Sequence, residues 1–324
     1  MQIKYSKPST DIRQENIERF RKDTALAKRQ RMAYLKLRRS KRRSRCILCN
    51  LYLRGNSFDH RSLPFIQCAR CRHIQLAVVA PAGYADGFEF HTIYPKLNPP
   101  DYENRKRRIY KPKLDWIIRA LDSLKYSRSA LQKMKWLEIG SGAGDFLSAL
   151  KDFGVRSFWG VDGNRKLVAI ANSVLKRKST VCEAGEVSAI LSRYPAADIY
   201  VAFFVLEHAE NAFTIYKKLR ELPRRTIFVF SVPVFGLSAI LENIFQRNYA
   251  RSLDGIVHQQ MYTDESIRFA MKRAGFRIVS EWIFGQDASD FNRFVLCHLR
   301  RQFNSDMLMH VSNRLNQMEN SFGK

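Results

Sequence analysis

The chain has 324 residues, of which 45% are hydrophobic and 12% aromatic, so it can bury a sizeable core and wholesale disorder is excluded. Its formal net charge of +26 favours anionic partners, such as nucleic acid, phosphorylated substrates or acidic membrane surfaces, without choosing among them. The N-terminus is polar and lacks the apolar stretch of a secretory signal, and the most apolar segment, 226–245, is broken by Pro233 and Gly236. We therefore expect a cytoplasmic protein without a membrane span.

The first 45 residues form a basic segment, with 16 Lys or Arg against 4 Asp or Glu. Asp11 offers an N-cap, and no Gly or Pro follows until Gly55, which predicts one long helix from about 12 to 43. Its apolar stripe is broken and too irregular for a coiled coil. The stripe consists of Ile12, Ile17, Phe20, Met32 and Leu35. Two interpretations stay open: a solvated basic helix, or an arm that binds nucleic acid or a membrane surface.

Four of the six cysteines follow directly, as Cys46-x2-Cys49 and Cys68-x2-Cys71 with 18 residues between the pairs. This spacing is typical of a four-cysteine zinc ribbon, in which two tight turns present four thiolates to a tetrahedral metal. Four thiolates leave no open position for water, so the Zn²⁺ would be structural. We predict a zinc-ribbon domain and linker over 46–110, whose later part, 76–110, is rich in Pro and Gly.

From about residue 111 the pattern changes to short apolar strands that alternate with helices of about ten residues. Such alternation predicts an α/β fold, a doubly wound, mostly parallel, seven-stranded Rossmann-like sheet over 111–300, with a helical tail over 301–324. The expected strands are 135–139, 158–161, one beginning at 181, 198–203, 226–230 and 277–282. The expected helices are 114–124, 145–153, 167–176, 187–193, 212–222 and 265–274.

The first strand runs into Gly140-x-Gly142-x-Gly144, and a helix follows at once. Glycines at a strand-to-helix turn let the backbone approach a ligand closely, at the sheet edge where doubly wound folds bind ligands. Asp162 ends the next strand, where a carboxylate can accept hydrogen bonds from both hydroxyls of a ribose. These residues predict a nucleoside-containing cofactor, either S-adenosylmethionine or NAD.

The fourth strand is followed by Leu206-Glu207-His208, and the chain here resembles the class I methyltransferases, which use S-adenosylmethionine. The likeness extends from about 134 to 285 and includes Ala274-Gly275-Phe276 before a late strand. It implies that Glu138, Gly140, Gly142 and Gly144 shape the methionine side of the cofactor site. It further implies that Asp162 holds the ribose, that Glu183 and Ala184 lie near the adenine, and that Phe203 lines the cofactor.

A four-cysteine module ahead of such a domain is similar to the sugar C-methyltransferase group, which implies a sugar, nucleotide-sugar or glycan-type acceptor. His258 and His208 are the candidate general bases, His258 being preferred. That group carries Tyr-x-Glu-His where this chain has Gly255-Ile256-Val257-His258, so only the histidine is shared and carbon methylation of a ketosugar is in doubt.

Other functions stay open. An RNA or protein methyltransferase would use the basic arm, but no Asn-Pro-Pro-Tyr-like element follows the fourth strand. A NAD-dependent oxidoreductase, or a binding protein that keeps the fold without catalysis, would share the glycine loop.

Overall fold

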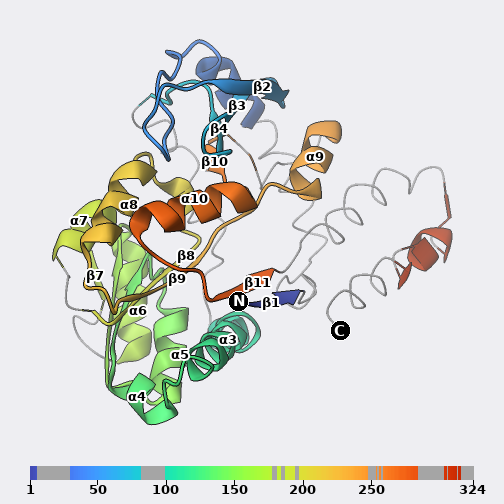
Figure 1. Cartoon of the computed structure of the whole chain (residues 1–324). Coiled ribbons are helices and arrows are strands. Elements are labelled where there is room, and N and C mark those ends of the chain that lie inside the picture. Colours follow the sequence, from blue (N-terminus) through green and yellow to red (C-terminus); the bar gives the residue numbers. More distant parts are fainter. Residues whose placement is uncertain are drawn as a thin grey trace. The chain divides into compact units, whose positions relative to one another are not determined.

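Figure 1 shows the computed structural model of the chain. The structure describes residues 1–5, 30–81, 99–176, 181–183, 187–193, 197–246, 253, 255–256, 258–283, 303–304, 306–311 and 313–314. The chain divides into two compact units, each assembled from separate stretches. The cysteine unit comprises Met1–Glu89, Pro233–Ile267 and Ser280–Lys324, and the glycine-loop unit comprises Phe90–Val232 and Arg268–Val279. The sequence-based domain boundaries at 45, 110 and 300 stay a prediction.

The glycine-loop unit contains a parallel sheet with the strand order β7-β6-β5-β8-β9. The chain runs outward from β5 through β6 to β7 and returns to β8 on the other side of β5. This order defines a doubly wound α/β fold, in which the reversal beside β5 creates a ligand-binding crevice at the carboxyl ends of the strands. The strands are β5 (Lys135–Ile139), β6 (Ser157–Asp162), β7 (Val181–Glu183), β8 (Ile199–Phe203) and β9 (Ile227–Ser231).

The expected count of seven strands is not confirmed, because five strands form this sheet within the described residues. The late strand predicted over 277–282 is observed as β11 (Ser280–Ile283). It pairs in parallel with β1 (Gln2–Tyr5) in a separate two-stranded sheet. Strand propensity at 277–282 therefore predicted the element correctly but not its neighbour, since a short strand's partner depends on the tertiary structure.

Amphipathic helices bury their apolar sides against this sheet in one core. Phe146, Leu150 and Trp136 are completely buried in it. Gly154, in the left-handed conformation, ends α5, because a residue without a Cβ adopts that geometry without strain. The helices of this core are α3 (Lys111–Asp122), α4 (Arg128–Lys133), α5 (Asp145–Phe153) and α6 (Arg165–Leu175). Further helices are α7 (Val187–Arg193), α8 (Ala212–Glu221) and α10 (Asp264–Ala274).

The end of the expected linker is helical. Residues 99–122 form α2 (Pro99–Arg105), the π-helical turn η3 (Lys106–Tyr110) and α3 in direct succession. The sequence pattern predicts a linker at Pro99 and Pro100, but proline is compatible with the first turn of a helix, where its missing N–H is not needed. Residues 82–98 of this segment lie outside the described part of the chain.

The cysteine unit contains a four-stranded antiparallel sheet with the order β10-β4-β3-β2. Three strands come from the predicted ribbon region: β2 (Gly55–His60), β3 (Leu63–Cys68) and β4 (Ile74–Leu76). The fourth, β10 (Gln260–Met261), comes from far along the chain, and α9 (Leu237–Ile244) contributes Ala239 to the same core. The ribbon is therefore completed by residues that the sequence assigned to the other domain.

Part of the basic arm belongs to this core. Residues 30–37 are helical, the helix ends there instead of at 43, and 12–29 lie outside the described residues. Tyr34 and Leu37 are buried, whereas Met32 and Leu35 of the predicted stripe are exposed. The side of the helix that packs in the core is therefore not the apolar side that the sequence pattern indicated. In the C-terminal tail, 306–311 are helical. No helix among the described residues is long and apolar enough to cross a membrane.

Candidate functional site

The loop between β5 and α5 has the backbone that its glycines predicted. Gly140, Gly142 and Gly144 have φ values of 70°, 53° and 81°, all in the left-handed region. A Cβ on Gly140 would lie 2.3 Å from Val205 Cγ2, so this position is sterically closed. A Cβ on Gly142 would meet no atom within 4 Å. Gly144 is also packed, since its added Cβ would lie 3.1 Å from Ala171 Cβ, so of the three glycines Gly142 is the one that faces open space.

Asp162 holds this loop in place. Its Oδ2 accepts a hydrogen bond of 2.7 Å from the Gly142 backbone N–H, and its Oδ1 accepts one of 2.8 Å from the Asn164 N–H. Each carboxylate oxygen can accept more than one hydrogen bond, so the side chain retains capacity for the hydroxyls of a ribose. The acidic residue and the loop form one preorganised structure.

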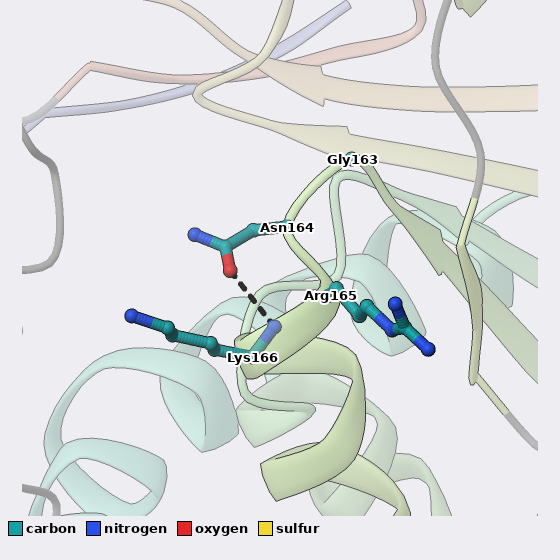
Figure 2. Close-up of a pocket in the computed structure, with 4 residues that line it drawn as sticks. All are labelled: Gly163, Asn164, Arg165 and Lys166. Carbon is teal, nitrogen blue, oxygen red and sulfur yellow. Dashed lines mark hydrogen bonds between the residues drawn. The ribbon is translucent and has the colours of Figure 1, made fainter. Parts of the chain in front are cut away.

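A hollow of ≈ 330 Å³ lies directly beyond Asp162 and is lined by Gly163, Asn164, Arg165 and Lys166. Figure 2 shows the Asn164 and Lys166 side chains on one side of this turn and Arg165 on the other. Asn164 caps α6, since its Oδ1 accepts hydrogen bonds from the Lys166 and Leu167 N–H groups. The turn therefore remains rigid at the carboxyl end of β6.

The other predicted cofactor residues lie along the same edge of the sheet. Glu183 ends β7 and pairs with Asp162. Ala184 lies outside the described residues. Phe203 ends β8, and its ring packs edge-on against Phe146 with the centroids 5.1 Å apart. In the parallel register Glu183 lies beside Asp162, whereas Glu138, on the other neighbouring strand, lies opposite Gly160.

Lys113, on α3, was not among the predicted site residues, yet it is buried beside them. Its Nζ lies 4.3 Å from the ring centroid of Phe203 and 4.2 Å from that of Phe204, distances typical of cation–π contacts. Burial lowers the pKa of Lys113 to about 7, while Glu138 and Glu207 act in the opposite direction. A helix outside the glycine motif therefore contributes a cation to this sheet edge.

Three carboxylates of this unit, Glu138, Asp145 and Glu207, are almost fully buried. Burial raises the pKa of Glu138 well above its usual range, and Asp145 and Asp162 add to this effect. Burial also raises the pKa of Glu207 to about 8. Glu138 Oε2, Asp145 Oδ1 and both Glu207 oxygens have no hydrogen-bond partner in another described residue. A cationic or hydrogen-bonding ligand would supply partners that the protein itself does not.

Helix α2 adds two contacts to the start of α5. The Tyr102 hydroxyl donates a hydrogen bond of 2.9 Å to the Gly144 carbonyl. Arg105 Nη2 lies 3.5 Å from Asp145 Oδ2, in a part-buried ion pair. These residues fix the last glycine of the loop and the first residue of α5. Sequence reasoning missed them because the segment was interpreted as a linker.

The four predicted metal-binding cysteines converge in the cysteine unit, and all four are buried. The Sγ atoms of Cys46 and Cys71 are 3.5 Å apart, those of Cys49 and Cys68 are 3.9 Å apart, and all four lie within 4.8 Å of one another. Sulfur atoms around a tetrahedral zinc, with Zn–S bonds of about 2.3 Å, would be about 3.8 Å apart. The cluster fits that group in both ligand type and spacing.

The two cysteine turns have the same hydrogen bonds. The Cys46 N–H donates to the Leu51 carbonyl and the Asn50 N–H donates to the Cys46 carbonyl. At the second turn, the Cys68 N–H donates to the His73 carbonyl and the Arg72 N–H donates to the Cys68 carbonyl. Asn50 and Arg72 have φ values of 58° and 61° at equivalent positions. Such paired turns position two thiol groups each, as a tetrahedral metal site requires.

The thiol groups interact with one another. Hydrogen bonds from Cys46 and then Cys71 lower the pKa of Cys49, and the hydrogen bond with Cys49 raises the pKa of Cys46. A dication bound at the cluster would displace the remaining thiol protons and convert all four residues into thiolates.

The two candidate bases lie in different units. His208 follows Glu207 in a 3-10 turn, with its Nε2 4.0 Å from Glu207 Oε1, and it is partly exposed. His258 belongs to the cysteine unit, where its carbonyl accepts a hydrogen bond from the Gly255 N–H just before β10. The catalytic role of either histidine stays a prediction.

The sequence profile of a family described as "Methyltransferase domain" matches residues 105–281, more than half of the chain. The chain belongs to this methyltransferase family. The match begins at Arg105 and includes the glycine loop and the buried carboxylates Glu138, Asp145 and Glu207. It confirms the predicted class, a methyltransferase enzyme with an α/β fold, and supports S-adenosylmethionine as the cofactor. A NAD-dependent oxidoreductase is thereby disfavoured. A comparison with curated proteins gives no match.

Several solved structures are similar to parts of the chain. A magnesium protoporphyrin IX methyltransferase from Synechocystis PCC 6803, with bound SAH, is 18% identical, with a TM-score of 0.39 over 59% of this chain and 84% of that one. A SAM-dependent methyltransferase from Archaeoglobus fulgidus is 18% identical, with a TM-score of 0.36 over 58% and 75%. A riboflavin-derivative dimethyltransferase from Streptomyces davawensis is 22% identical, with a TM-score of 0.35 over 56% and 55%.

Proposed function

We propose that this protein transfers a methyl group from S-adenosylmethionine to a small-molecule acceptor, with a sugar, nucleotide-sugar or glycan as the preferred acceptor class. The observation that carries the donor assignment is the loop at Gly140–Gly144, with Asp162 hydrogen-bonded to its open glycine. The support for a sugar acceptor is the four-cysteine cluster, which resembles the zinc module of the sugar C-methyltransferases.

In the proposed site, Asp162 binds the ribose hydroxyls, and Glu138, Gly140, Gly142 and Gly144 shape the methionine side. Glu183 and Ala184 lie near the adenine, and Phe203 lines the cofactor. The donor supplies an activated sulfonium, from which the methyl leaves as its bonding electron pair returns to sulfur. The protein's contribution is mainly alignment of the acceptor atom with the methyl group. A hydroxyl or acidic carbon acceptor also loses a proton, for which His258 is the preferred base and His208 the alternative.

We further propose that Cys46, Cys49, Cys68 and Cys71 bind a structural Zn²⁺. Supporting observations are the burial of all four residues, their spacing and the two matching turns. Closed thiolate coordination leaves the metal no direct part in methyl transfer.

The donor assignment is tested with Asp162→Ala and calorimetric titration of S-adenosylmethionine. We expect binding to become undetectable, because the variant loses the ribose acceptor and the anchor of the Gly142 N–H. Glu221→Ala, an exposed carboxylate at the end of α8, is the control and should bind as the parent does. Circular dichroism verifies that both variants are folded. Unchanged binding by Asp162→Ala would refute the assignment.

The acceptor class is tested by incubating the protein with labelled S-adenosylmethionine and separate panels of nucleotide-sugars, glycans, peptides and RNA. Label in a sugar panel supports the proposal. Label in RNA or peptide alone contradicts it and favours the arm-dependent alternative.

A further inference from the structure

The helix at residues 30–37 has apolar side chains on two different sides. Tyr34 and Leu37 are buried in the core of the cysteine unit. Met32 and Leu35, on the outer side, are 60% and 58% exposed. The buried pair fixes the rotation of the helix, so Met32 and Leu35 cannot turn into the core without exposing that pair. The helix therefore displays two large apolar side chains at the surface.

Cations surround these two side chains. Arg31 and Lys36 are their neighbours on the helix, Arg38 and Arg39 follow directly, and all four are exposed. Within the described part of the chain, none of the four forms an ion pair. Residues 30–58 include nine Lys or Arg and no Asp or Glu, so no carboxylate nearby in sequence balances the charge. The basic apolar face consists of Arg31, Met32, Leu35, Lys36, Arg38 and Arg39.

The same composition continues in the segment that follows the helix. Lys41 and Arg42 are exposed, and both contact the chain at residues 78–79. The Val79 N–H donates a hydrogen bond of 2.9 Å to the Lys41 carbonyl, and Arg42 forms an antiparallel β-bridge with Val78. The Val79 side chain is itself exposed. Two further cations and a further apolar side chain thus lie directly beyond the basic apolar face.

A partner for this face has to accept both kinds of side chain. Nucleic acid phosphates would pair with the cations, but bases stack on aromatic rings, of which the face has none. A helix that is merely solvated would leave Met32 and Leu35 in water. An anionic bilayer surface accepts both, because cations pair with its headgroups while apolar side chains enter the boundary of the acyl region. No described helix is long and apolar enough to span a bilayer, so the contact would be with its surface.

We propose that the basic apolar face binds an anionic lipid surface, with Met32 and Leu35 inserted between headgroups whose charges the surrounding cations neutralise. Charge complementarity brings the face to the bilayer, and insertion of the apolar pair makes the contact specific for lipid. The face belongs to the cysteine unit, so its lipid binding is independent of the methyl-donor site in the other unit.

The test measures cosedimentation of the full chain with vesicles of phosphatidylcholine mixed with phosphatidylserine, and with vesicles of phosphatidylcholine alone. We expect the parent to bind the mixed vesicles and not the others. The apolar variant, Met32→Ser with Leu35→Ser, should weaken this binding at least about tenfold, because the inserted apolar area is lost. The charge variant, Lys36→Gln with Arg39→Gln, should weaken it about thirtyfold, as expected for two cations at an anionic surface.

The matched control is Met307→Ser with Val311→Ser, which also replaces two exposed apolar side chains on a helical segment of the same unit. It should bind the mixed vesicles as the parent does. Thermal unfolding should show parental stability for all variants, because every replaced side chain is exposed.

Single-stranded RNA binding, followed by fluorescence anisotropy, distinguishes lipid from nucleic acid. A parent that binds RNA and not the mixed vesicles would overturn the proposal, as would an apolar variant that binds those vesicles like the parent. Sedimentation velocity covers a second copy of the chain as partner. A parental dimer that the apolar variant breaks, without vesicle binding, would assign the face to self-association and also overturn the proposal.

Discussion

Single residues in the glycine loop have separable structural and functional roles. Gly140 and Gly142 both have positive φ, so an alanine at either position adopts a conformation that L-residues disfavour by about 1–2 kcal/mol. Only Gly140 is also enclosed, by Val205. The space beside Gly142 is open in the protein and is the space that a bound donor would need.

We expect Gly140→Ala to lower the free energy of unfolding by about 2–4 kcal/mol, because backbone strain adds to overpacking. Gly142→Ala should lower it by only about 1–2 kcal/mol, yet weaken donor binding at least tenfold. Gly275→Ala is the matched control, with φ of +79° and nothing within 4 Å of its added Cβ. It should have the same modest stability cost and normal donor affinity. Urea unfolding and calorimetry provide the two measurements; normal affinity in Gly142→Ala would contradict the proposed role of that glycine.

At the scale of elements, the two cysteine turns and the sheet around them depend on one another. The Ile47 N–H donates a hydrogen bond of 2.8 Å to Gln75 Oε1, which connects the first turn to β4. His73, just after the second turn, contacts Gln260 of β10 through its Nε2 at 2.7 Å. A metal at the cysteines would therefore stabilise strands that are distant in sequence.

Metal removal is expected to destabilise this unit. One equivalent of zinc per chain should be found by atomic absorption, and Cys49→Ser should lower that content, because three thiolates hold zinc more weakly than four. Chelation should increase the rate of proteolysis within 46–76. Cys182→Ser, outside the cluster, is the control. Full proteolytic resistance after complete metal removal would contradict a structural role.

At the scale of the whole molecule, the cost of burying charge makes stability depend on pH. Glu207 has a pKa raised to about 8, so the folded state binds more protons than the unfolded state between the two values. The contribution of Glu207 to the free energy of unfolding is fully present below its unfolded-state pKa, near 4.5, and is lost as the pH rises to about 8. Lys113, with its pKa lowered to about 7, contributes most above pH 10.5 and loses that contribution as pH falls through about 7.

Glu207→Gln should therefore stabilise the protein relative to the parent by an amount that grows from pH 5 to pH 8 and is constant above. Urea unfolding followed by tryptophan fluorescence measures this, since Trp116, Trp136 and Trp159 belong to the glycine-loop unit and only Trp282 belongs to the other. Glu221→Gln, at an exposed site, should show no such growth. A pH-independent difference for Glu207→Gln would show that its carboxyl has an ordinary pKa in the folded state.

The net charge of +26 also belongs to the whole molecule. Its basic N-terminal part is described over residues 1–5 and again from residue 30, where a helix contributes Tyr34 and Leu37 to a core. Binding of nucleic acid through residues 1–45 and a cytoplasmic location stay predictions.

The sequence by itself determined the features that depend on neighbouring residues. Gly140–Gly144, Asp162 and the cysteine pairs act through local backbone geometry, and their spacing indicated both the cofactor loop and the thiol cluster. The strands β5, β6, β8 and β9 were likewise predicted to within a residue or two, because short buried runs are a local signal.

Only the tertiary structure decided which distant residues come together. Arg105 enters the site because α2 contacts the start of α5, and Lys113 because α3 brings it to Phe203 at the end of β8. β10 completes the cysteine sheet from far along the chain. β11 pairs with β1 for the same reason. Burial of a charge and the partner of a strand depend on the whole packing, which no local pattern encodes.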